Sequence, residues 1–299
     1  MTKSRNGTAA GRFAQGDLRD ILVVLDSYPE PAGKKVIESS VALAKKLDAH
    51  ITALSFEIGF KIKTSLVART LGVGRGAQEM LSVERQKSLS NAKELLRAFE
   101  IAAGKAGLRF DTILEESMQD EVSDAAIRHA RLRDFTIVST SDPELADSDA
   151  EDLLFGSGRP ILIPPRNLKR GDAPSLDNIA VAWDSSRVAT RAISDALPLL
   201  RLAKHVRVFT VLNEKALPST RLNAELQAHL ARHGIKAAIE HIDARRRPIV
   251  DVLRAYVEAK DIGMLVMGGY GHSRLKEFIL GGATKAVLTR PFQWTFLSH

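Results

Sequence analysis

The strongest constraint on the fold is that the second half of the chain repeats the pattern of the first. Residues 20–26, DILVVLD, form a short apolar run that ends in an acid, and residues 178–184, NIAVAWD, form a second run of the same kind. Such runs are typical of strands buried on both faces of a parallel sheet. The other correspondences, in chain order, are 34–47 with 190–202, 51–57 with 206–212, 135–140 with 263–268, and Arg159-Pro160 with Arg290-Pro291. One duplicated supersecondary unit explains this order.

Each half alternates strand-like runs with stretches whose apolar residues recur at helical spacing. In the first half we also predict strands at 111–116 and 160–165, helices at 77–106 and 122–131, and a short helical turn at 151–155. Strand, helix and strand joined by short connections form a right-handed unit of a parallel sheet. The pattern therefore predicts an α/β fold with two tandem, open, parallel five-stranded sheets flanked by helices. The alternative is that any two α/β halves look alike, but the recurring acid and Arg-Pro pair favour duplication.

The domain organisation follows from the repeat and from two stretches of loop composition. With 299 residues the chain is about twice the usual length of one domain. We predict a disordered tail at 1–17, a first domain at 18–166, a linker at 167–177 and a second domain at 178–299. Trp294, in a predicted final strand at 292–297, is expected to pack between the two copies.

Composition and charge exclude several classes of function. Hydrophobic residues make up 44% of the chain and charged residues 26%, as in ordinary globular proteins. No apolar stretch reaches the roughly 18 residues needed to cross a membrane, and residues 1–16 carry no signal-peptide pattern. We therefore expect a cytoplasmic protein. With no cysteine, thiolate metal sites and cysteine nucleophiles are excluded.

The net charge of +7 raises the question of nucleic acid as a partner. Acidic residues are interspersed with the basic ones along the helical stretches, and aromatic residues make up only 5% of the chain. A single-stranded nucleic acid would need aromatic side chains between the charges. We do not expect nucleic-acid binding.

A glycine-rich loop follows the predicted strand at 263–268. The chain reads Gly268-Gly269-Tyr270-Gly271-His272, and after eight further residues it reads Gly281-Gly282-Ala283-Thr284. Glycines allow backbone N–H groups to approach an anion, and 281–284 would open a helix whose positive end faces a phosphate. His272, Arg274 and Lys276 add cationic or hydrogen-bonding groups. Asp184, at the end of a neighbouring strand, can accept a hydrogen bond from a base or a ribose.

The loop matches neither the Walker pattern nor the dinucleotide fingerprint, so a pair of tight turns without a ligand is the open alternative. Here the sequence resembles the universal stress protein family, whose nucleotide-binding members carry Gly, two residues, Gly, nine residues, Gly, then Ser or Thr. Gly268, Gly271 and Gly281 fit this spacing, and residues 270–288 are similar to the end of tandem members. The resemblance covers the chain from Leu18 onward.

The resemblance implies an adenine nucleotide alpha hydrolase-like fold and a bound adenine nucleotide, which is ATP, with or without Mg²⁺, or AMP or ADP. It also implies that the two domains form an internal pseudo-dimer and that two chains can form a homodimer. The residues it implies for the site are Ala182, Asp184 and Val211 around adenine and ribose, Met267 and Gly268 beside the nucleotide, and Gly271, His272, Gly281, Gly282 and Thr284 near the phosphates. Gly282 departs from the family pattern, because it stands where ATP-binding members have Ser or Thr.

The first half departs further from the family pattern. After the predicted strand at 135–140 the chain reads Ser-Asp-Pro-Glu at 141–144, without the glycine pair. Acidic residues repel phosphate. Asp26 and the glycines at 156 and 158 remain, but they do not make a complete site. We predict that the first site is empty or holds a ligand other than ATP.

No arrangement of residues indicates catalysis. The sequence shows no Ser-His-Asp set and no metal-ligand spacing, so we predict no catalytic residue and no metal ligand, and at most a slow ATPase. The leading hypothesis is a cytoplasmic stress-response protein that binds adenine nucleotide in its second domain. The alternative is a nucleotide-independent interaction protein with vestigial sites, in which an exposed turn at 245–247 contacts a partner.

Overall fold

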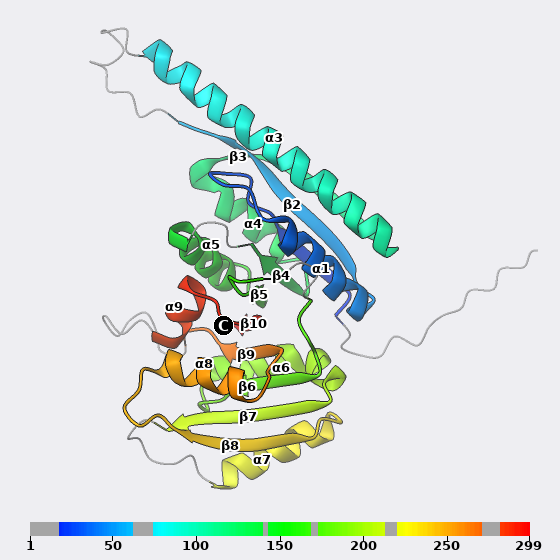
Figure 1. Ribbon diagram of the computed structural model, residues 1–299, viewed down its shortest axis with the longest axis vertical. Coiled ribbons are helices and arrows are strands. Elements are labelled where there is room, and N and C mark those ends of the chain that lie inside the picture. Colours follow the sequence, from blue (N-terminus) through cyan, green and yellow to red (C-terminus); the bar gives the residue numbers. More distant parts are fainter. Residues whose placement is uncertain (1–17, 62–73, 140–142, 169–172, 213–219, 271–281) are drawn as a thin grey trace, which may run out of the picture.

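The fold is known from a computed structural model that describes residues 18–61, 74–139, 143–168, 173–212, 220–270 and 282–299. The first half contains β1 (Asp20–Val24), α1 (Lys34–Leu47), β2 (His50–Gly59), α3 (Gly74–Ala106), β3 (Phe110–Met118), a 3₁₀ turn (Gln119–Glu121), α4 (Val122–Ala130), β4 (Phe135–Val138), α5 (Pro143–Gly156) and β5 (Ile161–Ile163). The second half contains β6 (Asn178–Ala182), α6 (Arg187–Leu202), β7 (His205–Leu212), α7 (Thr220–Arg232), β8 (Ala237–Asp243), α8 (Ile249–Ala259), β9 (Met264–Gly268), α9 (Gly282–Thr289) and β10 (Thr295–Ser298). The α/β alternation and the duplication that the sequence predicts are confirmed (Figure 1).

All strands belong to one ten-stranded sheet in the order β3-β2-β1-β4-β5-β10-β9-β6-β7-β8. Each half contributes five parallel strands, as predicted, but the two sets are not separate sheets. They join where β5 pairs antiparallel with β10, with Phe296 opposite Leu162. Both strands are buried along their length, and an apolar edge strand left open would be a site of aggregation. Pairing the two edges removes this exposure.

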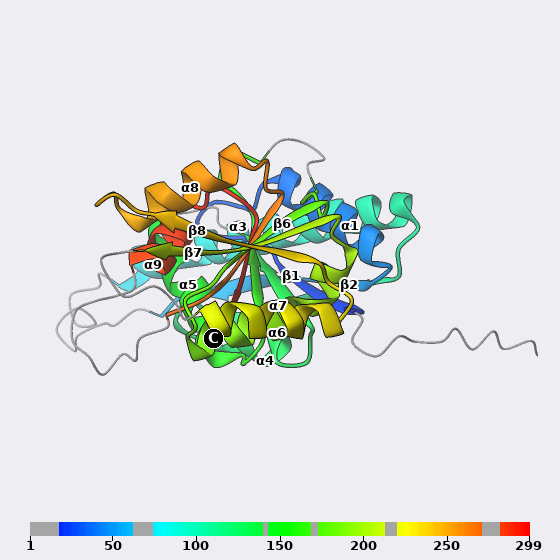
Figure 2. The same ribbon diagram turned by 90° about the horizontal axis from the view of Figure 1, so that it is seen from below.

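The antiparallel junction relates the halves by an approximate twofold axis. Read outward from the junction, the strand order is β5-β4-β1-β2-β3 on one side and β10-β9-β6-β7-β8 on the other. Because the strands of the two halves run in opposite directions, their carboxyl ends lie at opposite edges of the sheet. Figure 2 shows the twist of the sheet, with strands fanning out around a common centre.

Two hydrophobic cores cover the two faces of the sheet, and each core contains residues of both halves. One core holds side chains of α1, α3, α6 and α7, and the other holds side chains of α4, α5, α8 and α9. Trp294 is 3% exposed and belongs to the first core, together with Phe135 of the first half. This core is shared by the two halves, which agrees with the expectation for Trp294, although Trp294 precedes β10 and is not in a strand that begins at 292. The domain boundaries at 166 and 178, which fall after β5 and at the start of β6, stay a prediction.

Two helices differ from their predicted bounds for identifiable reasons. The helical turn predicted at 151–155 is confirmed as helix but is too short, because it forms the end of α5, a helix of 14 residues that begins at Pro143. Proline is favoured at the first position of a helix, where its missing N–H costs nothing. The helix predicted at 190–202 begins at Arg187, because the Ser186 hydroxyl accepts a hydrogen bond from the Ala189 N–H and caps the first turn.

Among the described residues, no helix combines the length and the apolar character that a membrane span requires. The longest described helix, α3, has 33 residues, but charged side chains occur throughout it.

Candidate functional site

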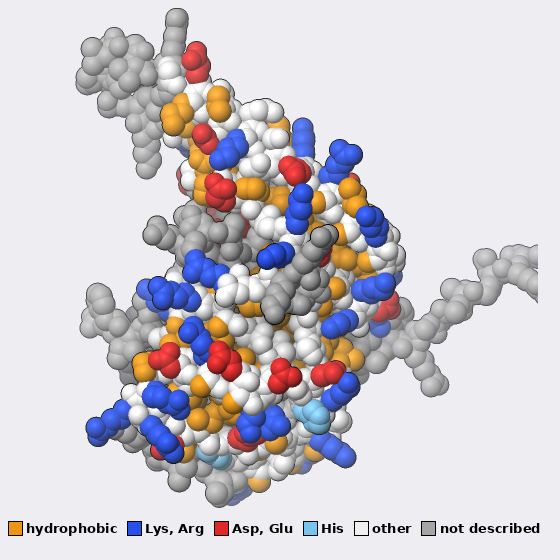
Figure 3. Space-filling view, viewed as in Figure 1, with side chains coloured by type: hydrophobic (Ala, Val, Ile, Leu, Met, Phe, Trp, Pro, Cys, Tyr) orange, Lys and Arg blue, Asp and Glu red, His pale blue; other side chains and the backbone are white. Residues whose placement is uncertain are grey.

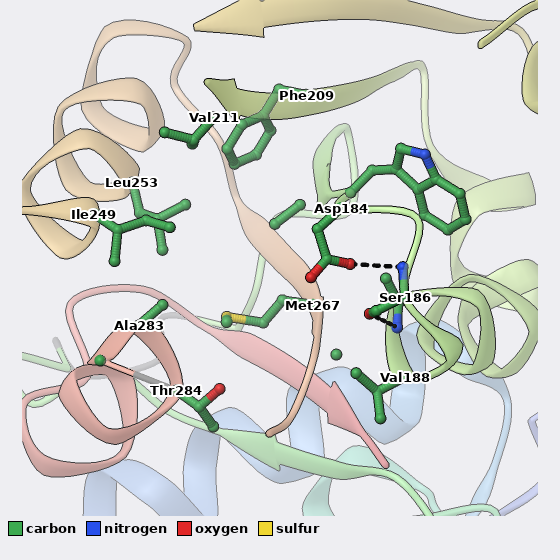
Figure 4. A pocket seen from close by; sticks show the side chains of 15 residues that line it. Asp184, Ser186, Val188, Phe209, Val211, Ile249, Leu253, Met267, Ala283 and Thr284 are labelled. Atoms are coloured by element: carbon green, nitrogen blue, oxygen red, sulfur yellow. Dashed lines mark hydrogen bonds between the residues drawn. The ribbon is translucent and has the colours of Figure 1, made fainter. Parts of the chain in front are cut away.

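A pocket of about 260 Å³ lies at the carboxyl ends of β6 and β9, bordered by the start of α6, by α8 and by α9 (Figure 4). β6 pairs with β7 on one side and with β9 on the other. From β6 the chain first adds strands on one side, β7 and β8, and then returns to add β9 on the other side, so the strand order switches direction between β6 and β9. Ligand sites of open α/β sheets form at such points, because the loops diverge there and leave a crevice.

The pocket brings together the predicted site residues that the structure describes. Ala182, Asp184, Val211, Met267, Gly268, Gly282 and Thr284 all line it. They come from separate segments of the second half and meet only in the folded chain. Gly271, His272 and Gly281 lie outside the described residues.

Asp184 is the one carboxylate among the described residues that line the pocket. One of its oxygens, Oδ1, accepts a hydrogen bond of 2.9 Å from the Ser186 N–H. Ser185, between them, has a left-handed backbone with φ of 62°. The turn therefore holds the carboxylate at the mouth of the pocket, where Figure 4 shows it pointing into the space between α8 and α9.

The wall opposite Asp184 is apolar. Phe209 and Val211 on β7 and Ile249 and Leu253 on α8 face the pocket together with Met267 (Figure 4). The predicted set missed Phe209, Ile249 and Leu253. Phe209 could have been found, because it stands two residues before Val211 and alternate residues of a strand share a face. Ile249 and Leu253 are four apart at the start of a helix, which places them on one side of it.

Tyr256 on α8 supports this wall from behind. Its ring stacks on Phe209 with centroids 4.3 Å apart, and its hydroxyl donates a hydrogen bond of 3.1 Å to Glu240. Burial, followed by the nearby Glu240 carboxylate, raises the pKa of Tyr256 well above its usual value. The phenol therefore stays neutral and keeps its proton for the bond to Glu240.

Gly268 lies where the end of β9 meets the start of α6. A Cβ atom at this position would lie 2.6 Å from the backbone nitrogen of Ala189 and 2.6 Å from the carbonyl carbon of Val188. These are backbone atoms of a capped helical turn, so they cannot move aside as a flexible side chain can. Glycine is needed at 268 for this close approach.

The other end of the pocket is formed by the first turn of α9. Gly282, Ala283 and Thr284 line it, and the first N–H groups of a helix have no partner within the helix. The Thr284 hydroxyl is buried and accepts a hydrogen bond of 3.2 Å from the Tyr270 N–H. This bond holds the backbone of Tyr270 against the first turn of α9. The Thr284 hydroxyl can still donate a hydrogen bond of its own. A Cβ atom at Gly282 would have no atom within 4 Å.

The residues after β9 also contact the first half. The Tyr270 hydroxyl donates a hydrogen bond to Glu151 of α5, and its ring lies 5.2 Å from that of Phe155. A Cβ atom at Gly269 would lie 2.5 Å from the Leu154 side chain. The segment that leads into the glycine loop is therefore packed against α5.

The corresponding position of the first half is occupied by its own side chains. The strand registers place Ser139 where the second half has Gly268. The Ser139 hydroxyl donates to Asp26 at 2.9 Å and accepts from the Asp26 N–H at 3.2 Å. Asn91 of α3 donates a hydrogen bond of 2.9 Å to the carbonyl of Ser27 and holds the loop after β1. Asp26 therefore has a protein partner where Asp184 faces a pocket.

Two further observations concern what the site can bind. The turn at 245–247 follows β8 at the same edge of the sheet, and its three arginines are exposed, as predicted. The Arg245 N–H donates a hydrogen bond of 2.8 Å to Asp243, which closes the turn.

Within the described part of the chain, no group of three or more His, Asp or Glu side chains is arranged to hold a metal ion.

The fold and pocket define a duplicated α/β protein with a ligand-sized crevice in its second half. Residues 175–291 match the model of the universal stress protein family. Over this range the second half of the chain is similar to universal stress proteins. Comparison with curated proteins found no match.

Several solved structures share the fold over nearly the whole chain. A universal stress protein from Archaeoglobus fulgidus has 16% sequence identity and a TM-score of 0.66, with 93% of this chain and 95% of that chain covered. A putative universal stress protein from Pseudomonas aeruginosa has 16% identity and a TM-score of 0.52, with coverage of 94% and 93%. A protein of unknown function from the same species has 15% identity and a TM-score of 0.52, with coverage of 94% and 92%. At this identity the likeness concerns the fold, including its two-part arrangement.

Proposed function

We propose that the second half of this protein binds an adenine nucleotide, with ATP as the preferred ligand, and that the protein acts in the cytoplasm in the response to stress. The observation that supports this most directly is the pocket at the ends of β6 and β9. It combines an apolar wall, a carboxylate at its mouth and a helix start at its other end. The apolar wall suits a base, the carboxylate can accept a hydrogen bond from a ribose hydroxyl, and the helix start favours a phosphate chain.

In this proposal the adenine ring packs against Phe209, Val211 and Leu253, since a flat apolar ring gains from burial against such side chains. The Asp184 oxygen that is not bonded to Ser186 accepts from a ribose hydroxyl. The phosphates lie at the first turn of α9, where unpaired N–H groups and the helix dipole favour an anion. Mg²⁺ would be held by the phosphates and water.

The pocket supports binding better than turnover. Hydrolysis needs a group that positions or deprotonates a water molecule close to the terminal phosphate. The polar side chains among the described lining residues are Asp184, Trp183, Ser186 and Thr284, of which Ser186 caps α6 and Thr284 holds Tyr270. We therefore assign no catalytic residue.

Titration calorimetry with ATP and Mg²⁺ tests the proposal on a matched pair of variants. Asp184→Asn keeps an oxygen for the Ser186 N–H but removes the charge, and should weaken ATP binding about 10- to 100-fold, the range expected when a hydrogen bond to a charged group is lost. Asp26→Asn changes the equivalent residue of the first half, which is bonded to Ser139, and should leave the affinity unchanged. Absence of heat with the unaltered protein, or an equal effect of both changes, would refute the assignment.

Gly282 offers a test in the opposite direction. The structure leaves room for a side chain at this position, because no atom lies within 4 Å of the point that a Cβ would occupy. Gly282→Ser restores the hydroxyl of the family pattern at the first turn of α9 and should tighten ATP binding by about tenfold through one added hydrogen bond to a phosphate. Gly282→Ala is the control and should leave the affinity within about threefold of the original value. Equal affinities of the serine and alanine variants would place the phosphates elsewhere.

A further inference from the structure

Tyr270, two residues after the end of β9, has an unusual backbone conformation. Its φ is 52°, in the left-handed region that residues with a side chain as large as tyrosine rarely adopt. Such a conformation persists only where the surrounding structure holds the residue from several sides. Tyr270 is 8% exposed, so packing as well as hydrogen bonds can hold it.

The side chain of Tyr270 is held by α5, which belongs to the first half of the chain. Its hydroxyl donates a hydrogen bond to the Glu151 carboxylate, and its ring lies 5.2 Å from the ring of Phe155. The neighbouring Gly269 packs closely against Leu154 of the same helix. α5 also contacts α9, and Figure 1 shows the two helices next to each other across the junction of the halves. The first half therefore fixes where the side chain of Tyr270 lies.

The backbone of Tyr270 is held by the second half of the chain. Its N–H donates a hydrogen bond of 3.2 Å to the Thr284 hydroxyl in the first turn of α9. Met267 and Gly268 before it, and residues 282–284 after it, line the pocket. Tyr270 thus links the end of β9 to the turn at which the phosphates of a nucleotide would lie. A shift of its side chain would be passed to that turn.

The position of this turn matters more for a phosphate than for a base. Lys285 and Arg290, on α9 and directly after it, are exposed, and Figure 3 shows Lys and Arg side chains gathered over α9 at the left of the molecule. This positive surrounding favours an anion over a wide range of distances. Hydrogen bonds from the first N–H groups of α9 form only within a narrow range of distance and angle. A base packed against Phe209 and Val211 does not depend on them.

We propose that Glu151 of the first half is a positioning residue for the pocket of the second half. Through Tyr270 it holds the first turn of α9 where that turn can bind phosphate. Every described residue that lines the pocket belongs to the second half, so Glu151 acts without touching the ligand. The halves are already joined by β5 and β10 and by two shared cores, so their attachment does not require this hydrogen bond. The inference rests on the proposed function, because it needs a nucleotide whose phosphates lie at α9.

Titration calorimetry with ATP and with adenosine measures this effect on variants of the full chain. Glu151→Ala removes the acceptor of the Tyr270 hydroxyl and should weaken ATP binding about fivefold or more, the size typical of changes that act on a site through its neighbours. Adenosine binding should stay within about twofold of its original value, since adenosine has no phosphate. Glu151→Gln keeps an oxygen that accepts the bond and should retain the ATP affinity. Asp152→Ala, at the next and exposed residue of α5, is the control and should change neither affinity.

Tyr270→Phe removes the other partner of the same hydrogen bond and keeps the ring against Phe155. It should weaken ATP binding as much as Glu151→Ala does. The two changes together should weaken it no more than either alone, because both remove one interaction. Circular dichroism on each variant excludes unfolding as the cause.

Linkage predicts the converse effect. If the Glu151 contact strengthens ATP binding, then bound ATP must strengthen that contact by the same factor. Amide hydrogen exchange at residues 150–156 of α5 should therefore slow when ATP binds, and it should not slow with adenosine or in the Glu151→Ala variant.

These measurements separate the inference from the proposed function. An unaltered protein that binds neither ATP nor adenosine refutes the proposed function, and the inference with it. An unaltered protein that binds ATP, with an affinity that Glu151→Ala and Tyr270→Phe leave unchanged, overturns the inference alone. Equal losses of ATP and adenosine binding, or losses that add in the double variant, also overturn it, because they indicate a general disturbance of the pocket.

Discussion

Replacing Phe296 by alanine should lower the free energy of unfolding by about 3–5 kcal/mol, the range measured for large aromatic side chains removed from a protein core. Phe296 is 0% exposed and lies on β10, opposite Leu162 of the antiparallel partner strand. Its ring packs against that of Phe135 across the junction, with centroids 6.0 Å apart. The change would leave a cavity at the place where the two halves meet, because the strands on both sides are held in the sheet and cannot collapse into it.

Urea denaturation followed by circular dichroism measures this loss. Because both cores contain residues of the two halves, we expect the unaltered protein to unfold in a single transition. Phe292→Ala is a matched control, since this half-buried ring lies outside β10, beside Arg254, and should cost clearly less. A cost at Phe296 no larger than that at Phe292 would mean that the junction contributes little to stability.

Replacing Gly268 by alanine should both destabilise the protein and abolish detectable ATP binding. The added Cβ atom would lie 2.6 Å from the backbone of Ala189 and of Val188, so β9 and the start of α6 must separate. Forcing atoms into a packed position typically costs about 1–3 kcal/mol. The separation would displace Met267, which is on β9, and Asp184, which is hydrogen-bonded to the N–H of Ser186 at the start of α6.

The comparison with Gly282→Ala isolates the steric effect. Both changes add one methyl group to a glycine that lines the pocket, but the alanine at 282 meets no atom within 4 Å. Thermal unfolding and ATP titration on the two variants should therefore give a lowered melting temperature and lost binding at 268, and neither effect at 282. Equal melting temperatures would show that the close approach of α6 to β9 can relax without cost.

Much of the fold could be predicted because its signals are local. The helix predicted at 34–47 agrees with α1, Lys34–Leu47, since apolar spacing along one helix does not depend on distant residues. The buried runs at 20–26 and 178–184 gave β1 and β6 to within two residues, because a strand covered on both faces is apolar throughout. The start of α5 is not predicted, because the acidic segment that contains Pro143 has the composition of a loop, whereas proline also favours the first position of a helix.

The candidate site was predictable to the extent that a strand end or a glycine marks it. Asp184, Met267 and Gly268 stand at strand ends, and the fold of an α/β sheet brings those ends to one edge. Ile249 and Leu253 were missed because nothing in the start of α8 shows that it faces a crevice and not the core. The same apolar spacing serves both purposes.

By itself, the sequence determined the duplication, the identity of most strands and helices, and the difference between the glycine loop of the second half and the acidic segment of the first. Only the tertiary structure decided that the two sheets become one through β5 and β10, and that Ser139 binds Asp26 from a position 113 residues away. The physical reason is that the apolar patterns of buried strands and of helices depend on residues that are close together in the sequence. Pairing of strand edges and partners of polar side chains depend on which distant segments the fold brings together.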